Sequence, residues 1–224
     1  MAQLSFCPDP VAEATKQIHE GLLLALSQSA ERVGLMVSGG RTPAKVLPMV
    51  LSKSGIDWDR IDIVASDERL VGIDDPASTE GMIRRIFSDA GCPCHYIGFG
   101  ADPAPEAALE KWRAGVAAMA WPPAVAFVGI GDDAHTASLF PGRPESADVS
   151  LRMAAVPETV PHAHARLTFG PAALAECASV VLVVGDADKQ AALDLAVQPE
   201  TTPSDTPVRW VCDLQQALIL CQKT

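Results

Sequence analysis

Residues 124–142, AVAFVGIGDDAHTASLFPG, carry more information about the fold than any other stretch of this sequence. The run 124–130 is apolar and short for a helix, which is typical of a strand that is buried on both faces. Gly131, Asp132 and Asp133 follow it directly. Because strands with two buried faces belong to parallel sheets that are covered by helices, this stretch predicts an α/β fold.

The same order of apolar run, polar loop and helical pattern recurs along the chain. Predicted strands that end in glycine or polar residues lie at 33–37, 61–65, 124–130, 152–156, 180–184 and 208–212. Predicted helices lie at 9–29, 43–51, 79–88, 103–119 and 187–196, with a final helix after residue 212. This alternation predicts a single domain over residues 1–224, with a doubly wound, largely parallel sheet and helices on both faces. In such sheets, ligands bind at the carboxyl ends of the strands.

His135 follows the two aspartates in the loop after the run 124–130. A single histidine is most often structural, but here Asp133 is close enough to orient the imidazole ring. Such a pair can activate water, whereas a zinc site would need more His or Cys ligands than this segment contains. We therefore predict that His135 and Asp133 form a catalytic pair that needs no metal.

The segment SGGRTP at 38–43 lies between a predicted strand and a predicted helix. Gly39 and Gly40 would let backbone N–H groups approach an anion, and Thr42 adds a hydroxyl group. The segment lacks the lysine of a P-loop and the third glycine of a dinucleotide motif, so neither ATP nor NAD is indicated, and we expect no cofactor. On its own, it fits a phosphate site and a plain tight turn equally well.

Charged residues follow other predicted strands. Asp67, Glu68 and Arg69 end a buried strand, where unpaired charges are costly, so they form either an ion-pair network or part of a ligand site. Arg166 and Lys189 each fit ordinary surface charge when they are considered alone. Together with the glycine loop, however, these cations would neutralise a phosphate dianion.

Composition argues against several classes of partner. The chain has 224 residues and a net charge of −11, which repels nucleic acid and anionic membrane surfaces. No stretch approaches the roughly 18 consecutive apolar residues of a membrane span. The six cysteines lack the paired spacing of a structural zinc site, and the N-terminus has no secretory pattern. We expect a cytoplasmic protein, monomeric or weakly homo-oligomeric, with a small anionic ligand and with no nucleic-acid, membrane or metal partner.

Together these motifs resemble the 6-phosphogluconolactonase family, within the glucosamine-6-phosphate isomerase-like superfamily. The similar segments occur in the family's order and are SGGRTP at 38–43, SDERLV at 66–71, GIGDDAHTASLFPG at 129–142, RLTFGPAAL at 166–174 and GDADK at 185–189. The ending ASLFPG resembles the lactonases, whereas the deaminases of the superfamily have an Ala-Phe-Asn-Glu-Pro-Gly ending. Ala134 stands where the family usually has Gly, and its Cβ is expected to alter the loop or narrow the pocket if that position has a positive φ.

The resemblance implies a hydrolase of the pentose phosphate pathway that opens 6-phospho-D-glucono-1,5-lactone. It implies that His135 is the general base and Asp133 its partner. The residues that it implies for the substrate's phosphate and hydroxyl groups are Ser38, Gly39, Gly40, Thr42, Asp67, Arg69, Arg166 and Lys189. Two alternatives stay open: an amino-sugar-phosphate isomerase or deaminase that uses Asp67 as base, and a non-catalytic sugar-phosphate-binding protein.

Overall fold

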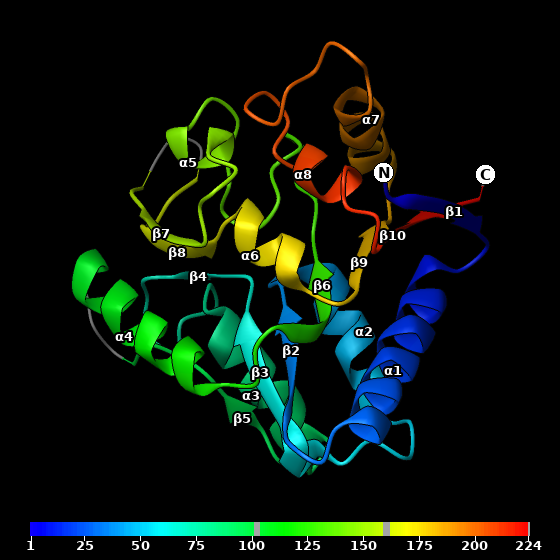
Figure 1. The fold of residues 1–224 in the computed structure, drawn as a ribbon, viewed down its shortest axis with the longest axis vertical. Coiled ribbons are helices and arrows are strands. Elements are labelled where there is room, and N and C mark those ends of the chain that lie inside the picture. Colours follow the sequence, from blue (N-terminus) through cyan, green and yellow to red (C-terminus); the bar gives the residue numbers. More distant parts are fainter. Residues whose placement is uncertain (101–103, 159–161, 224) are drawn as a thin grey trace.

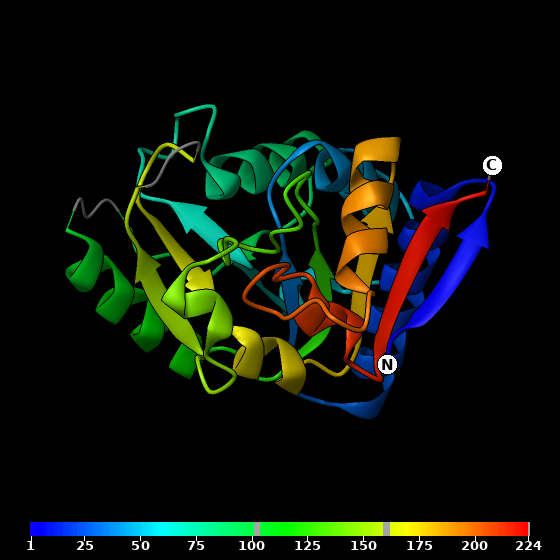
Figure 2. The ribbon, with the colours of Figure 1, turned by 90° about the horizontal axis from the view of Figure 1, so that it is seen from above.

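A parallel sheet of seven strands forms the centre of the computed structural model, which describes residues 1–100, 104–158 and 162–223 (Figure 1). Its strands, in their order across the sheet, are β1 (Gln3–Cys7), β10 (Ala217–Gln222), β9 (Val180–Val184), β6 (Pro123–Val128), β2 (Val33–Val37), β3 (Ile61–Ala65) and β5 (His95–Tyr96). The first and last strands pair at one edge, where both chain ends also lie (Figure 2). All the strand pairs described in this sheet are parallel, which confirms the predicted α/β class.

Helices cover both faces of this sheet. The longer ones are α1 (Pro10–Gln28), α2 (Arg41–Leu51), α3 (Thr79–Asp89), α4 (Pro105–Ala118) and α7 (Ala187–Ala196). The short ones are η1 (Trp58–Arg60), α5 (Pro144–Ala147), α6 (Pro171–Glu176) and α8 (Arg209–Cys212). In β2, Leu35 and Val37 pack with α1, α2 and α3, whereas Met36 packs in the cluster that holds α4, α6, α7 and α8. Successive side chains of a strand point to opposite faces, so a strand between two helical layers is apolar at almost every position. The buried Asp62 of β3 is an exception, and it forms an ion pair with Arg32.

A second sheet of three antiparallel strands lies to one side of the first (Figure 1). It has the order β4 (Asp67–Arg69), β8 (Arg166–Phe169) and β7 (Met153–Val156). Leu167 and Phe169 of β8 share a hydrophobic cluster with the main sheet. The register of β4 and β8 places Arg69 directly opposite Arg166, which decides the electrostatics of the site described below.

Several predictions about the elements are wrong. Residues 208–212 form α8 rather than a strand, because Val208, Val211 and Cys212 bury one side of a short helix in the core. The predicted final helix is instead β10, whose apolar run is buried between β1 and β9. Residues 152–156 contain a strand, but it belongs to the antiparallel sheet. The sequence interpretation also missed β1, β4, β5 and β8, and the start of the helix predicted at 103 lies outside the described residues.

No helix within the described ranges combines the length and the apolar character that crossing a membrane requires.

Candidate active site

A cavity of about 560 Å³ lies where the carboxyl ends of β2, β6 and β9 meet, beside the ends of β4 and β8. All ten residues that the sequence suggested for the site line it: Ser38, Gly39, Gly40, Thr42, Asp67, Arg69, Asp133, His135, Arg166 and Lys189. The topology explains this, because neighbouring parallel strands end at the same edge of a sheet. Arg41 and His162 also line the cavity, and the sequence interpretation had given neither of them a role.

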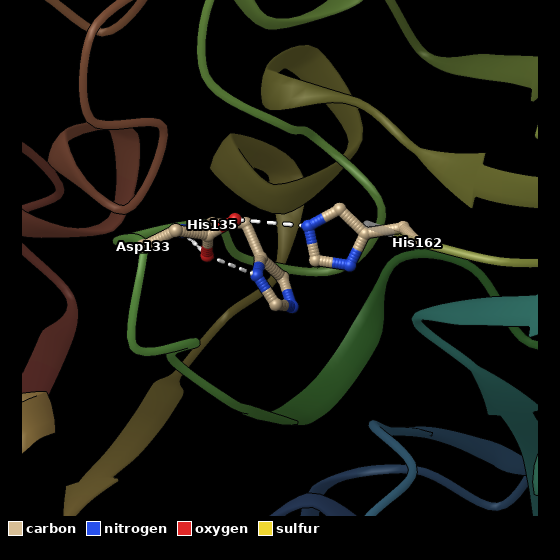
Figure 3. A group of neighbouring side chains, drawn as sticks. All are labelled: Asp133, His135 and His162. Carbon is tan, nitrogen blue, oxygen red and sulfur yellow. Dashed lines mark hydrogen bonds and ion pairs between the residues drawn. The ribbon is translucent and has the colours of Figure 1, made fainter. Parts of the chain in front are cut away.

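His135 and Asp133 are in direct contact. The Nδ1 atom of His135 lies 2.5 Å from Oδ1 of Asp133. An ionised carboxylate can only accept hydrogen bonds, so the proton of the neutral ring lies on Nδ1, which leaves the lone pair on Nε2. Figure 3 shows Nε2 on the side of the ring that faces away from Asp133. With 26% of its side chain exposed, His135 is accessible to a ligand in the cavity.

His162 approaches the same carboxylate from a segment 29 residues further along the chain. Its Nε2 atom donates to Oδ2 of Asp133 at 2.9 Å, so each carboxylate oxygen holds one imidazole ring (Figure 3). The ring of His162 also stacks on Phe140, with centroids 4.0 Å apart. Burial of Asp133 opposes its ionisation, but the hydrogen bonds from His135 and His162 outweigh burial and hold the carboxyl pKa below its usual range. Asp133 is therefore an anion at neutral pH.

These three side chains would also suit a metal ion, because their ligand atoms all lie within 4.8 Å of one another. In the present arrangement, however, each carboxylate oxygen of Asp133 forms a hydrogen bond with one of the two histidines. The hydrogen bonds account for the geometry of the cluster.

The loop that carries His135 has an unusual backbone. Ala134 has a φ of 64°, a conformation that glycine adopts more easily than alanine. Its side chain is only 1% exposed and packs into the hydrophobic cluster below the loop instead of lining the cavity. The expectation that this Cβ narrows the pocket is therefore wrong. At Gly131, by contrast, a Cβ would collide with Nδ1 of His135, so the turn requires glycine.

Ala134→Gly is expected to change the free energy of unfolding by less than about 1 kcal/mol and to leave kcat near the parent value. Relief of the left-handed strain, worth about 1–2 kcal/mol, opposes the loss of a buried methyl group and the greater freedom of glycine in the unfolded chain. Urea unfolding measures the first quantity. A decrease of more than about 2 kcal/mol in the free energy of unfolding would show that loss of the methyl group outweighs relief of the backbone strain.

Asp67 and Glu68 point in different directions and form hydrogen bonds with different parts of the structure. The Oδ2 atom of Asp67 accepts from Ser138 Oγ at 2.6 Å and lies 3.7 Å from Nη1 of Arg166. Glu68 is 3% exposed and accepts from the backbone N–H groups of Arg69, Thr79 and Glu80, the last two at the start of α3. Burial raises the pKa of Glu68 to about 7, against the lowering effect of these donors. The hydrogen bonds of Glu68 therefore connect β4 with the start of α3. Of the two carboxylates, only Asp67 lines the cavity.

Arg69 and Arg166 give the cavity an excess of positive charge. They are cross-strand partners, and like charges in that position repel each other. Burial of Arg166, together with the nearby charge of Arg69, lowers the pKa of its guanidinium despite the opposing effect of Asp67. The Nε atom of Arg166 and the Oγ atom of Ser38 are buried without a hydrogen-bond partner among the described residues. An ordered water or a ligand would satisfy such groups, and the positive charge around these two favours an anion.

The glycine loop exposes backbone N–H groups to the same cavity. A Cβ at Gly39 would lie 2.5 Å from the hydroxyl oxygen of Thr79, and Gly40 has a φ of 103°. No side chain caps α2 at Gly40, so its first N–H groups remain available. Lys189 is held on α7, where Asp186 caps the helix and lies 3.9 Å from the lysine Nζ atom. The loop, the two arginines and Lys189 thus offer donors that can hold a small anion next to His135.

Comparisons with known proteins agree with one another on the family. The family model described as "Glucosamine-6-phosphate isomerases/6-phosphogluconolactonase" matches residues 8–220. The chain is 34% identical over 200 residues to the 6-phosphogluconolactonase of Caulobacter vibrioides, covering 84% of this chain and 83% of that protein. It is 33% identical over 188 residues to the Synechocystis sp. 6-phosphogluconolactonase, covering 79% and 76% of the two chains. The crystal structure of a 6-phosphogluconolactonase from Shewanella baltica has the same fold, with a TM-score of 0.87, 22% identity and coverage of 99% and 97%.

Proposed function

The chain belongs to the family of glucosamine-6-phosphate isomerases and 6-phosphogluconolactonases, and we propose that it hydrolyses 6-phospho-D-glucono-1,5-lactone to 6-phospho-D-gluconate. The observation that carries this proposal is the contact of His135 with Asp133 at 2.5 Å, in a cavity that also holds Arg69, Arg166 and Lys189. His135 and Asp133 can activate water, and the three cations can hold a phosphate. Hydrolysis of a phosphorylated lactone requires both functions.

In the proposed reaction, His135 Nε2 takes a proton from a water molecule as the water oxygen attacks C1 of the lactone. The bond from this oxygen to C1 forms, and the carbonyl becomes an oxyanion. When the carbonyl re-forms, the bond between C1 and the ring oxygen breaks, and the imidazolium returns its proton to the departing oxygen. Asp133 fixes the tautomer of His135 and stabilises the imidazolium, and His162 holds the second oxygen of that carboxylate.

We assign the substrate's phosphate and hydroxyl groups to the remaining residues of the cavity. Lys189, Arg166 and Arg69 supply charge, and Gly39 and Gly40 supply backbone N–H groups. The hydroxyl groups of Ser38 and Thr42 and the carboxylate of Asp67 add hydrogen-bonding groups for the sugar. The unpartnered Oγ atom of Ser38 supports this assignment.

Deamination or isomerisation of an amino-sugar phosphate is the alternative within the family, with Asp67 as the base. Here Asp67 already accepts hydrogen bonds from two serine hydroxyls, Ser66 and Ser138, and lies beside Arg166, whereas Nε2 of His135 has no partner among the described residues. The geometry therefore favours His135 as the base. Parallel assays for 6-phosphogluconate release from the lactone and for ammonia release from glucosamine 6-phosphate test which reaction the protein catalyses. Ammonia release without lactone hydrolysis would favour the deaminase, with Asp67 as the base.

A non-catalytic sugar-phosphate-binding protein is the alternative outside enzymes. It predicts that 6-phosphogluconate raises the Tm of the protein while the lactone is hydrolysed no faster than in buffer. We also propose a cytoplasmic location and a monomer or weak homo-oligomer, in keeping with a chain of net charge −11 whose ligand is a small metabolite.

Hydrolysis is expected to survive treatment with EDTA, because imidazole and carboxylate together suffice to deprotonate water. The measurement is the initial rate before and after chelation and dialysis. Loss of turnover that zinc or another divalent ion restores would contradict the mechanism, and it would point to Asp133, His135 and His162 as metal ligands.

A further inference from the structure

A second cavity, of about 580 Å³, opens beside the first, between the start of α2, the start of α3 and the loop before β8. Four arginines line it: Arg41, Arg69, Arg85 and Arg166. No Asp or Glu occurs among the described residues of its lining. Three of the four arginines also line the first cavity, so the two are continuous, and Arg85 belongs to the second one alone. We call this second cavity the arginine annex.

The positive charge of the annex is poorly neutralised. Within the described ranges, Arg41 and Arg85 form no ion pair. Arg69 donates from Nη1 to the carbonyl oxygen of Ala77 at 2.8 Å, which orients the guanidinium without cancelling its charge. Arg166 is 7% exposed, and its Nε atom has no partner. In a chain of net charge −11, four arginines around one cavity are an unusual concentration of charge, and among the described residues only Asp67 pairs with any of them, at 3.7 Å from Arg166.

The neighbouring arginine on α3 shows the contrast. Arg84 forms an ion pair with Glu80 at 2.7 Å and lies over the ring of Tyr96. Arg85 instead folds back toward the start of α3, where a Cβ at Gly81 would lie 3.1 Å from its Nη1 atom. Two adjacent residues of one helix therefore differ in partner and direction, and only the unpaired one faces the annex.

The proposed reaction does not require this extra charge. A lactone with one phosphate is served by Lys189, the glycine loop and the cross-strand pair of Arg69 and Arg166. Arg41 and Arg85 then remain beside that pair; Arg85 lines only the second cavity, whereas Lys189 lines only the first. The annex thus has the charge and the volume for a second phosphate group.

We propose that the arginine annex binds a second phosphate-type anion next to the active site, so that two linked phosphates bind more tightly than one. One phosphate of a linked diphosphate would bind at Arg69 and Arg166, and the other at Arg41 and Arg85. It would compete with the sugar phosphate and inhibit the enzyme. The inference is independent of the reaction proposed above, because the annex is defined by charge and shape alone.

The test compares inorganic phosphate with inorganic pyrophosphate in metal-free buffer, using thermal-shift and calorimetric titrations on the parent, Arg85→Gln and Arg84→Gln. The parent is expected to bind pyrophosphate at least about tenfold more tightly than phosphate. Arg85→Gln is expected to lose about tenfold in pyrophosphate affinity, the value of one charge-assisted hydrogen bond. Arg84→Gln removes the same net charge and should bind pyrophosphate as the parent does, and Arg85→Lys should recover part of the affinity. Adenosine diphosphate in a parallel titration distinguishes a nucleotide from a free diphosphate.

Two results would overturn the proposal. Equal pyrophosphate affinities for the parent and Arg85→Gln would show that the annex binds no anion. A fall in kcat/KM for the phosphorylated lactone in Arg85→Gln, as large as the fall in pyrophosphate affinity, would show that the annex is the substrate's own phosphate site. The expected kcat/KM of Arg85→Gln is that of the parent. The titrations need no turnover, so they stay informative even if the lactone is not the substrate.

Discussion

Replacing His135 with glutamine is expected to lower kcat by about 10²–10⁴-fold, with a much smaller change in KM. Glutamine keeps a polar side chain of similar length but cannot take a proton from water near neutral pH. Substrate binding should persist, because the phosphate-binding residues stay in place. Every rate has to be taken as enzyme minus blank, since the lactone also hydrolyses spontaneously.

Asp133→Asn, which changes the partner of His135, should also reduce kcat. An amide can donate as well as accept, so it no longer requires the proton to stay on Nδ1 of His135. A near-parental kcat in a folded His135→Gln protein would refute the assignment of the base. Asp67 would then become the leading candidate, since Glu68 is committed to the backbone of α3.

Arg166→Gln is expected to reduce kcat/KM for the phosphorylated lactone by about 10–150-fold, equivalent to about 1.5–3 kcal/mol for a lost charged hydrogen bond. Arg166 is the most buried cation of the site, so solvent screens its interaction with a phosphate least. Activity on unphosphorylated gluconolactone should fall much less. The ratio of the two kcat/KM values therefore isolates the contribution of the phosphate.

Folding has to be checked in this variant, because loss of Arg166 leaves Asp67 with one cation fewer. Arg166→Lys keeps the charge and serves as the control. Arg69→Ala and Lys189→Ala should each weaken recognition of the phosphate as well. The proposed phosphate site is wrong if the variants at all three positions keep the parent's ratio of kcat/KM for phosphorylated and unphosphorylated lactone.

The sheet was predictable where strands are buried on both faces. The runs that became β2, β3, β6 and β9 are apolar apart from Asp62 in β3, and polar or glycine residues follow them, so pattern alone indicated both the strands and the edge where their ends meet. That edge brought together the ten residues suggested from sequence. Their location follows from topology, and their roles await the experiments described above.

The remaining features depend on long-range contacts. The residues of α8 include Trp and Val, which favour strands, but burial against the core decides their conformation. The pairing of Arg69 with Arg166 depends on the register of a second sheet, which no local pattern indicates. His162 reaches Asp133 across 29 residues, and its nearest sequence signal was only its place shortly before Arg166. Arg85 gave no signal at all, because only the folded structure shows that it lines the annex and forms no ion pair with any described residue.

The central claim is that this cavity hydrolyses a phosphorylated lactone by means of His135. The most direct test is the initial rate of 6-phosphogluconate formation from freshly made 6-phosphogluconolactone, with parent and His135→Gln proteins at equal concentration and a protein-free blank. We predict rapid hydrolysis by the parent and a rate close to the blank for the variant. A parent rate no higher than the blank, with a folded protein and fresh substrate, would contradict the claim.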